Sequence, residues 1–447
     1  MNFIETVFKA YDIRGLVGSE LTNDLALAVG RGFADFLPDE GPVAVGYDMR
    51  PDSKALAEQL RKGIVAQGRD VIDIGEVSSD MIYFATGFLE AAGGAMVTAS
   101  HNPGQYNGMK LCGRLASGIS IDTGLGQIRD TIKSETFKKN VSVGTITKQD
   151  ITEDWVDHAL SFVNAKAWKP FRIAVDAGDG MAGKIFPRIE SKIPLSVYGM
   201  YFKLDGTFPN HPANPMLPAN VAAESAEIVR NKFDFGIAFD GDGDRAFLLD
   251  ENGQEISASI LGAILVEHFL KENPGATILY NAVCSHILPD TIKLLGGVPQ
   301  RTKVGHSYIK PDMRKYSAPF AAEASGHFYF RDNFNADSGL IAALVAIEVL
   351  NNSGLPLSQL AAKYHKYSNS GEINLTVTDK TEVLEKVTQA FPDGEQDNLD
   401  GLTISYPNWW FNIRGSNTEP LLRLNIEADR DAVLAEKQAQ LLALIKG

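Results

Sequence analysis

Three copies of one pattern restrict the fold of this chain more than any other feature of its sequence. In each copy an apolar strand leads through a polar loop into a helix and then into a second strand. The first copy has strands at 42–47 and 70–74 around a helix at 55–67, and the others begin near Phe171 and Ala276. Strands that alternate with helices at this spacing predict βαβ units and mixed or parallel sheets. The copies share no local sequence identity, so the repetition is one of architecture.

The sequence changes in character after about residue 368. Strands expected at 372–377 and 402–406, with a terminal helix at 431–445, predict a smaller α+β unit. At 447 residues the chain is too long for one hydrophobic core. We therefore expect an α/β protein of four domains, with three mixed α/β sheet domains of similar topology and a C-terminal α+β domain. Polar or glycine-rich stretches predict the domains 1–150, 151–253, 254–368 and 369–447.

Charge and cysteine content disfavour several classes of protein. The 42 Lys and Arg residues oppose 56 Asp and Glu residues, and the net charge of −14 argues against a nucleic-acid or anionic-membrane partner. Cys112 and Cys284 are too few for a disulfide framework, which favours a reducing compartment. The N-terminal residues lack the apolar stretch of a secretory signal, and no apolar run approaches the ~18–20 residues that span a bilayer. We expect a soluble, cytoplasmic protein.

The first loop with a candidate catalytic residue is Thr-Ala-Ser-His-Asn-Pro at 98–103, directly after a strand-like segment at 94–97. A polar turn that ends at a proline is its ordinary interpretation. The alternative is that Ser100 acts as a nucleophile or phosphoryl carrier at the end of a strand. A serine hydroxyl is a weak nucleophile unless a base or a metal lies beside it, so this interpretation requires partners elsewhere in the chain.

The second loop carries three carboxylates at alternating positions, Asp240, Asp242 and Asp244, between two apolar strands. Carboxylates this close repel one another unless a cation lies between them, so the loop predicts a site for a hard divalent ion. An EF-hand is the competing interpretation, with Glu251 at its twelfth position. Arg245 stands where that loop requires glycine, and the flanks are expected to be strands rather than helices. The pattern favours Mg²⁺ over Ca²⁺ and suits phosphoryl transfer.

Two further loops carry polar groups but are less specific. Residues 323–327 combine an acceptor, Glu323, and a hydroxyl with His327, although an ordinary surface histidine would also fit. Residues 414–420 combine Arg414 with a glycine turn and hydroxyl side chains, and Arg423 follows. These groups could form a phosphate cradle, and an ordinary exposed turn is the alternative.

Taken together and in this order, the four loops resemble those of the α-D-phosphohexomutase superfamily, and most closely its bacterial phosphomannomutase/phosphoglucomutase branch. The resemblance extends from Phe-Lys-Ala-Tyr-Asp-Ile-Arg-Gly at 8–15 to the loop at 414–420. It implies three mixed α/β domains and a mobile fourth α+β domain around a central cleft, with one loop contributed by each domain.

The resemblance also implies roles for individual residues. It makes Ser100 a phosphoserine whose phosphoryl group completes a Mg²⁺ site with Asp240, Asp242 and Asp244. It places Arg14, Lys110 and Arg245 beside the transferred group and makes His327 the general base. It also implies a set of substrate contacts, of which Arg414, Ser416, Asn417 and Thr418 hold the non-transferred phosphate. The full set is Tyr11, His101, Lys303, Gly305, His306, Glu323, Ser325, His327, Arg414, Ser416, Asn417, Thr418 and Arg423.

The activity implied is the interconversion of mannose 6-phosphate and mannose 1-phosphate, with the glucose phosphates as further substrates, through a hexose 1,6-bisphosphate. A metal-dependent phosphatase that uses the same serine is the main alternative, and a Ca²⁺-binding module is a second one that Arg245 disfavours. The partners expected are sugar phosphates, and a monomer and a dimer are both compatible with the sequence.

The chain departs from the family pattern at three positions. Ala322 and Ala324 replace the usual Gly and Met around Glu323, which leaves the contacting residues intact. Val283 stands where relatives often carry a basic residue. The Ser-Asn-Thr order at 416–418 favours this branch over phosphoglucosamine mutases, which usually have Gly at position 417.

Overall fold

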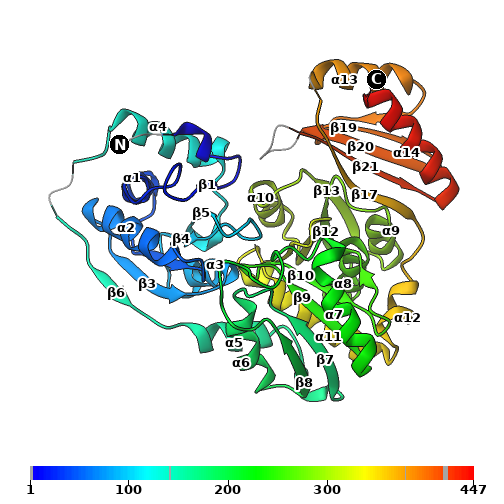
Figure 1. Cartoon of the computed structure of the whole chain (residues 1–447), viewed down its shortest axis with the longest axis horizontal. Coiled ribbons are helices and arrows are strands. Elements are labelled where there is room, and N and C mark those ends of the chain that lie inside the picture. Colours follow the sequence, from blue (N-terminus) through cyan, green and yellow to red (C-terminus); the bar gives the residue numbers. More distant parts are fainter. Residues whose placement is uncertain (1–3, 140–141, 378, 416–420, 447) are drawn as a thin grey trace.

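The computed structural model describes residues 4–139, 142–377, 379–415 and 421–446. It contains four sheets, each formed by a successive segment of the chain (Figure 1). The first sheet has six strands, in spatial order β1 (Ile13–Leu16), β5 (Tyr106–Gly113), β4 (Gly93–Val97), β2 (Val43–Tyr47), β3 (Val71–Glu76) and β6 (Ile146–Lys148). Its helices are α1 (Asn23–Phe36), α2 (Ser53–Ala66), α3 (Ser79–Phe88) and α4 (Gly126–Ser134).

The second and third sheets have five strands each. The second has the order β11 (Glu255–Ile256), β10 (Ala246–Leu249), β9 (Phe235–Phe239), β7 (Phe171–Asp176) and β8 (Leu195–Met200), with helices α5 (Thr152–Leu160), α6 (Ala182–Glu190) and α7 (Pro218–Asn231). The third has the order β13 (Val298–Thr302), β12 (Thr277–Asn281), β14 (Phe320–Ala322), β15 (Phe328–Phe330) and β16 (Ala336–Asp337). Its helices are α8 (Ala258–Glu272), α9 (Ile287–Leu294), α10 (His306–Tyr316), α11 (Gly339–Ser353) and α12 (Leu357–Ala362).

These three sheets share one topology, which confirms the predicted repetition. In each, the first strand of the repeat lies between two parallel neighbours, and the third strand continues through a hairpin into an antiparallel partner. The hairpins are β4–β5, β9–β10 and β14–β15. The loops that the sequence analysis singled out at Ser100, Asp240 and Glu323 therefore occupy equivalent places in the three sheets.

The fourth sheet is antiparallel throughout and has two helices, as the predicted α+β unit requires. Its strands, in order, are β17 (Ser368–Leu375), β21 (Leu422–Ala428), β20 (Trp409–Gly415), β19 (Leu402–Tyr406) and β18 (Glu395–Asp397), and its helices are α13 (Lys380–Ala390) and α14 (Asp431–Lys446). Figure 1 shows this unit, in orange and red, at the opposite end of the molecule from helices α1 and α2.

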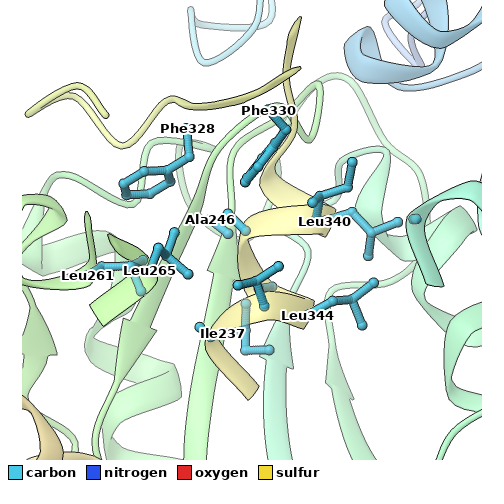
Figure 2. Packing of buried hydrophobic residues seen from close by; sticks show 14 of the residues in the cluster. Ile237, Ala246, Leu261, Leu265, Phe328, Phe330, Leu340 and Leu344 are labelled. Carbon is cyan, nitrogen blue, oxygen red and sulfur yellow. The ribbon is translucent and has the colours of Figure 1, made fainter. Parts of the chain in front are cut away.

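The hydrophobic core joins the first three sheets but not the fourth. One continuous apolar cluster includes residues of the first, second and third sheet units, whereas the fourth unit has a cluster of its own around Phe411 and Leu441. Figure 2 shows the joint core, where α11 packs against β10 of the second sheet and helix α8 of the third unit. Its labelled residues are Ile237, Ala246, Leu261, Leu265, Phe328, Phe330, Leu340 and Leu344. Burial of this shared apolar surface holds three of the four functional loops in fixed relation.

A buried carboxyl in the second unit predicts a pH-dependent stability. Glu224 on α7 is 0% exposed and lies against Gly236 of β9, where an added Cβ would meet its carboxylate oxygen at 2.7 Å. Burial, together with the negative charge of Asp176, raises the pKa of Glu224 well above 4.5. The unfolded chain thus loses this proton at a lower pH than the folded chain, so this group lowers stability as pH rises above 4.5.

We predict that Glu224→Gln, which keeps the shape and cannot ionise, raises the thermal unfolding midpoint relative to wild type by a few degrees near neutral pH. The gain should shrink as the pH falls toward and below 4.5, where the carboxyl of the unfolded wild-type chain also becomes protonated. Differential scanning calorimetry of both proteins over this pH range measures the effect. A difference between them that is the same at every pH would contradict the prediction.

Candidate active site

Ser100 lies where the first two functional loops meet. It follows β4, has a left-handed backbone with φ of 50°, and is 5% exposed. Its hydroxyl Oγ donates to Oδ2 of Asp240 at 3.0 Å and lies 3.1 Å from Nδ1 of His101. The serine and the acidic loop, which are 140 positions apart in the chain, are thus in direct contact, so this hydroxyl has a hydrogen-bond acceptor and a candidate metal site beside it, as a reactive serine requires.

The acidic loop between β9 and β10 has the chemistry of a divalent-cation site. Oxygens of Asp240, Asp242 and Asp244 lie within 4.8 Å of one another, and all three residues are buried. Oδ1 of Asp242 and Oδ1 of Asp244 have no hydrogen-bond partner among the described residues. An all-oxygen set with unsatisfied buried carboxylates suits Mg²⁺, with the Ser100 hydroxyl at its edge.

The charges in this loop are unevenly compensated. Burial raises the pKa of Asp240 to about 8, with Asp244 and Asp242 adding to the rise and Arg245 opposing it. Burial works against the charge of Asp242 as well, but Lys110 outweighs it and lowers the pKa of Asp242. Two cations therefore do not fully balance three acids, and a bound dication would supply the missing positive charge.

The three basic residues expected beside the transferred group lie around Ser100. Lys110, on β5, places Nζ 2.6 Å from Oδ2 of Asp242 and 2.5 Å from Oδ2 of Asp244. Arg245 donates from Nε to Asp240 at 2.9 Å, and its Nη2 lies 2.7 Å from Nδ1 of His101. Arg14, on β1, donates to Oδ1 of Asn102 in the serine loop at 2.6 Å. Together these three positively charged side chains lie around the negatively charged carboxylates of the acidic loop.

The third loop, between β14 and β15, brings its polar residues to the same place. His327 lies with Nε2 3.6 Å from Oδ1 of Asp244 and with Nδ1 2.9 Å from the hydroxyl of Ser325. Glu323 is 3% exposed and accepts hydrogen bonds from the Gly305 N–H at 2.8 Å, the Asn281 amide at 3.1 Å and the Tyr329 hydroxyl at 2.7 Å. The Glu323 carboxylate is therefore held in one orientation by the third unit itself.

Tyr11 joins the first unit to the loop before α10. Its hydroxyl donates to the carbonyl of Val304 at 3.0 Å, and its ring lies 5.6 Å from that of His306 in an edge-on arrangement. At Gly305, φ is +118° and an added Cβ would lie 2.7 Å from the Tyr11 ring, so glycine is required there. Desolvation, with the charges of Lys310 and Lys110, lowers the pKa of His306, which keeps this imidazole neutral at neutral pH.

The fourth loop is described only in part. Arg414, at the end of β20, is 4% exposed and donates to Glu372 at 2.9 Å, and Arg423 on β21 lies 3.3 Å from the other oxygen of that carboxylate. The predicted contacts Ser416, Asn417 and Thr418 lie outside the described residues. Desolvation raises the pKa of the Tyr11 hydroxyl, and the positive charge of Arg414 opposes this rise. Lys303 is exposed, with Nζ 5.4 Å from the centre of the Tyr308 ring.

Four family models match successive parts of the chain: phosphoglucomutase/phosphomannomutase domain I at 5–139, domain II at 153–253, domain III at 257–367 and the C-terminal domain at 372–444. Relatives include phosphohexose mutases of Xanthomonas campestris pv. campestris, 41% identical over 98% of this chain and 99% of the relative. A phosphomannomutase of Vibrio cholerae is 40% identical over 99% of this chain and 98% of the relative. The chain belongs to the phosphoglucomutase/phosphomannomutase family.

The solved structures agree with this assignment. The crystal structure of a phosphoglucomutase/phosphomannomutase family protein from Burkholderia thailandensis matches with a TM-score of 0.92 and 31% identity, over 99% of this chain and 98% of that one. The four-domain architecture expected from the resemblance is therefore confirmed. Within the part of the chain that the structure describes, none of the helices has the length and apolar character needed to cross a bilayer.

Several residues of this phosphohexomutase site were missed by the sequence analysis. Ser79, at the start of α3, donates its hydroxyl to Oδ2 of Asp242 at 2.5 Å. Glu372 joins the two arginines of the fourth loop, and Arg50 lies beneath the Ser100 loop. Ser79 and Arg50 follow β3 and β2, which run parallel to β4, so their position at the carboxyl edge of the sheet was the available signal.

The EF-hand interpretation of the acidic loop is wrong for two structural reasons. The flanking segments are strands β9 and β10 rather than helices. Glu251, which would be its twelfth ligand, instead accepts hydrogen bonds from the hydroxyl of Ser358 at 2.5 Å and from its N–H at 3.2 Å. Any cation in this loop is therefore held without Glu251.

This difference gives a matched test of the cation site. We predict that millimolar Mg²⁺ raises the thermal unfolding midpoint of wild type, because an ion that binds only the folded state stabilises it. Asp242→Asn removes a charged oxygen ligand and should weaken binding at least about tenfold, since even indirect changes at metal sites cost that much. Glu251→Gln should keep the wild-type response. Equal Mg²⁺-dependent shifts for wild type and Asp242→Asn, measured by differential scanning fluorimetry, would show that the ion binds elsewhere.

Proposed function

We propose that this phosphohexomutase interconverts mannose 6-phosphate and mannose 1-phosphate, and likewise the glucose phosphates, in the cytoplasm. The carrier is a phosphoryl group on Ser100, and the intermediate is a hexose 1,6-bisphosphate that also serves as activator. The observation that carries the proposal is the contact between the Ser100 hydroxyl and Asp240 at 3.0 Å, with the basic side chains of Arg14, Lys110 and Arg245 from two domains close by. The proposed division into domains at 1–150, 151–253, 254–368 and 369–447 gives each domain one functional loop.

In the first half-reaction, a hydroxyl of the bound sugar phosphate attacks the phosphoryl group of phospho-Ser100. A new P–O bond to the sugar forms while the bond to Oγ breaks, and Ser100 is left as the oxygen leaving group. Asp240, Asp242 and Asp244 would hold Mg²⁺, which when bound would supply positive charge to stabilise the transferring oxygens. Arg14, Lys110 and Arg245, which contact the serine loop or the acidic loop, would stabilise the same charge.

His327 is the residue best placed to take the proton of the attacking hydroxyl. Its Nδ1 is near the Ser325 hydroxyl, which orients the ring, and its other nitrogen faces the acidic loop. General-base catalysis of this kind contributes roughly 10²–10⁴ in rate. In the second half-reaction the bisphosphate presents its other phosphate to Ser100, and the same steps run in reverse.

The remaining predicted contacts hold the sugar and its second phosphate. Glu323 and Ser325 would bind sugar hydroxyls, with Tyr11, His101, Lys303, Gly305 and His306 lining the path between the loops. The second phosphate would be bound by Arg414, Ser416, Asn417, Thr418 and Arg423. A site with two phosphate positions has a use in a mutase, whereas a phosphatase that used Ser100 would need only one.

Removing the carrier tests this function. We predict that Ser100→Ala loses at least about 10³ of the mutase rate, since deletion of a covalent nucleophile has effects of this order or larger. It should also fail to take up labelled phosphate from glucose 1,6-bisphosphate. Ser120→Ala is the matched control, because Ser120 is a buried serine of the same domain whose hydroxyl contacts Thr123. Full activity of Ser100→Ala would refute the proposal.

The choice of sugar gives a second prediction. Mannose and glucose differ only at C2, and the hydroxyl contacts proposed for Glu323 and Ser325 are at C3 and C4, so both 1-phosphates should be converted. A coupled assay for each 6-phosphate product, with a trace of bisphosphate activator, measures the two rates. Release of inorganic phosphate without isomerised sugar phosphate would identify a phosphatase that uses the same serine.

A further inference from the structure

A buried arginine lies directly beneath the Ser100 loop. Arg50 follows β2, is 3% exposed, and donates four hydrogen bonds to carbonyl groups of the segment that carries the serine. Nη2 binds the carbonyls of Ser100 at 2.7 Å and Asn102 at 2.6 Å. Nη1 binds the carbonyls of Pro103 at 3.0 Å and Tyr106 at 2.9 Å. One planar group therefore fixes four points of a loop that leaves one strand and enters the next.

The guanidinium is itself held in place on its remaining sides. Its Nε lies 3.2 Å from Oδ2 of Asp48, and Asp48 also accepts a hydrogen bond from the Ser53 hydroxyl at 2.5 Å. The ring of Phe208, from the loop after β8 in the second domain, lies over the guanidinium carbon with 5.0 Å to the ring centre. Such stacking is an established mode of arginine binding and leaves the N–H groups free for the carbonyls.

The Ser100 carbonyl is enclosed from the other side as well. An added Cβ on Gly241, in the acidic loop, would lie 2.6 Å from this carbonyl oxygen. Arg50 and the acidic loop thus hold the Ser100 backbone between them, in a left-handed conformation that serine rarely adopts. The backbone of Ser100 decides where its Oγ lies relative to Asp240, so Arg50 acts on the reacting atom through the main chain.

We infer that Arg50 is a positioning residue for phosphoryl transfer, and this inference rests on the proposed function of Ser100. Within the described residues, the hydrogen bonds, ion pair and ring contact of Arg50 go to Ser100, Asn102, Pro103, Tyr106, Asp48 and Phe208, none of which is proposed to bind the sugar or its second phosphate, so Arg50 should affect transfer rather than substrate binding. Lysine cannot replace it, because its ammonium group has one nitrogen with three N–H donors and cannot bind four separate carbonyl oxygens at once. A displacement of a reacting group by about 1 Å costs on the order of 10²-fold in rate.

The test is single-turnover transfer from phosphoenzyme, prepared with glucose 1,6-bisphosphate, to glucose 1-phosphate. We expect Arg50→Lys to lower the transfer rate by about 10²-fold, while the KM for glucose 1-phosphate stays close to the wild-type value. Arg61→Lys is the matched control, because Arg61 is a buried arginine of the same domain that pairs with Asp73 at 2.9 Å. It should transfer at a rate near that of wild type.

A wild-type transfer rate in Arg50→Lys would overturn the inference, and so would a loss of rate that Arg61→Lys shares. If Arg50→Lys folds poorly, Phe208→Leu provides the test, because it keeps Arg50 but removes the aromatic ring above its guanidinium group. A reduced transfer rate of Phe208→Leu with an unchanged KM supports the inference. A wild-type transfer rate of this variant overturns it. Failure of wild type itself to transfer would refute the proposed function instead. Hydrogen exchange of residues 98–106 then still shows whether Arg50 holds the loop, because Arg50→Lys should exchange faster there than Arg61→Lys.

Discussion

Three carboxylates buried in one short loop are the constraint on which the rest of this structure depends. Asp240, Asp242 and Asp244 are at most 1% exposed, and burial without compensation is costly for any charged group. Lys110, the nearest cation, comes from a different domain, and a third domain contributes His327. Together with Arg245 of the loop itself, these residues surround the carboxylates at the place where three domains meet, and a divalent cation would supply the positive charge that is still missing.

The shared topology of the three sheets explains how distant segments meet at that point. Each sheet places its functional loop in the same hairpin, between its third strand and an antiparallel partner. Because the three units pack through one continuous apolar core, equivalent hairpins converge on one place. Helix α11, whose residues are largely buried, packs against β10 of the second unit and α8 of the third and so fixes the relation between these two domains (Figure 2).

The candidate metal-binding and reactive residues could be predicted from the sequence, whereas Ser79 and Arg50, which hydrogen-bond to those residues, could not. A run of Asp and Gly between two apolar strands has few interpretations other than a cation site, and alternation of strand and helix predicts the sheets directly. Ser79 looks like an ordinary helix start, and Arg50 lies in a polar loop with Asp48 beside it. Their roles depend on which strands are neighbours, and that order is set by packing across the whole chain rather than by local residues.

Within the described residues, the fourth domain has a core of its own and meets the others through polar contacts and a stacked ring pair, His286 with Trp410. Arg301 pairs with Asp397 at 2.7 Å, the Val304 N–H donates to Asp400 at 2.7 Å, and a cavity of about 240 Å³ lies near this seam, between residues such as Tyr280 and Trp410. Polar contacts of this kind exchange with water at little net cost, unlike an apolar core. The proposed reaction requires a second phosphate to be bound in two orientations of the sugar. A domain with its own core and a polar seam can change its orientation without disturbing the three loops that hold Ser100 and the acidic loop.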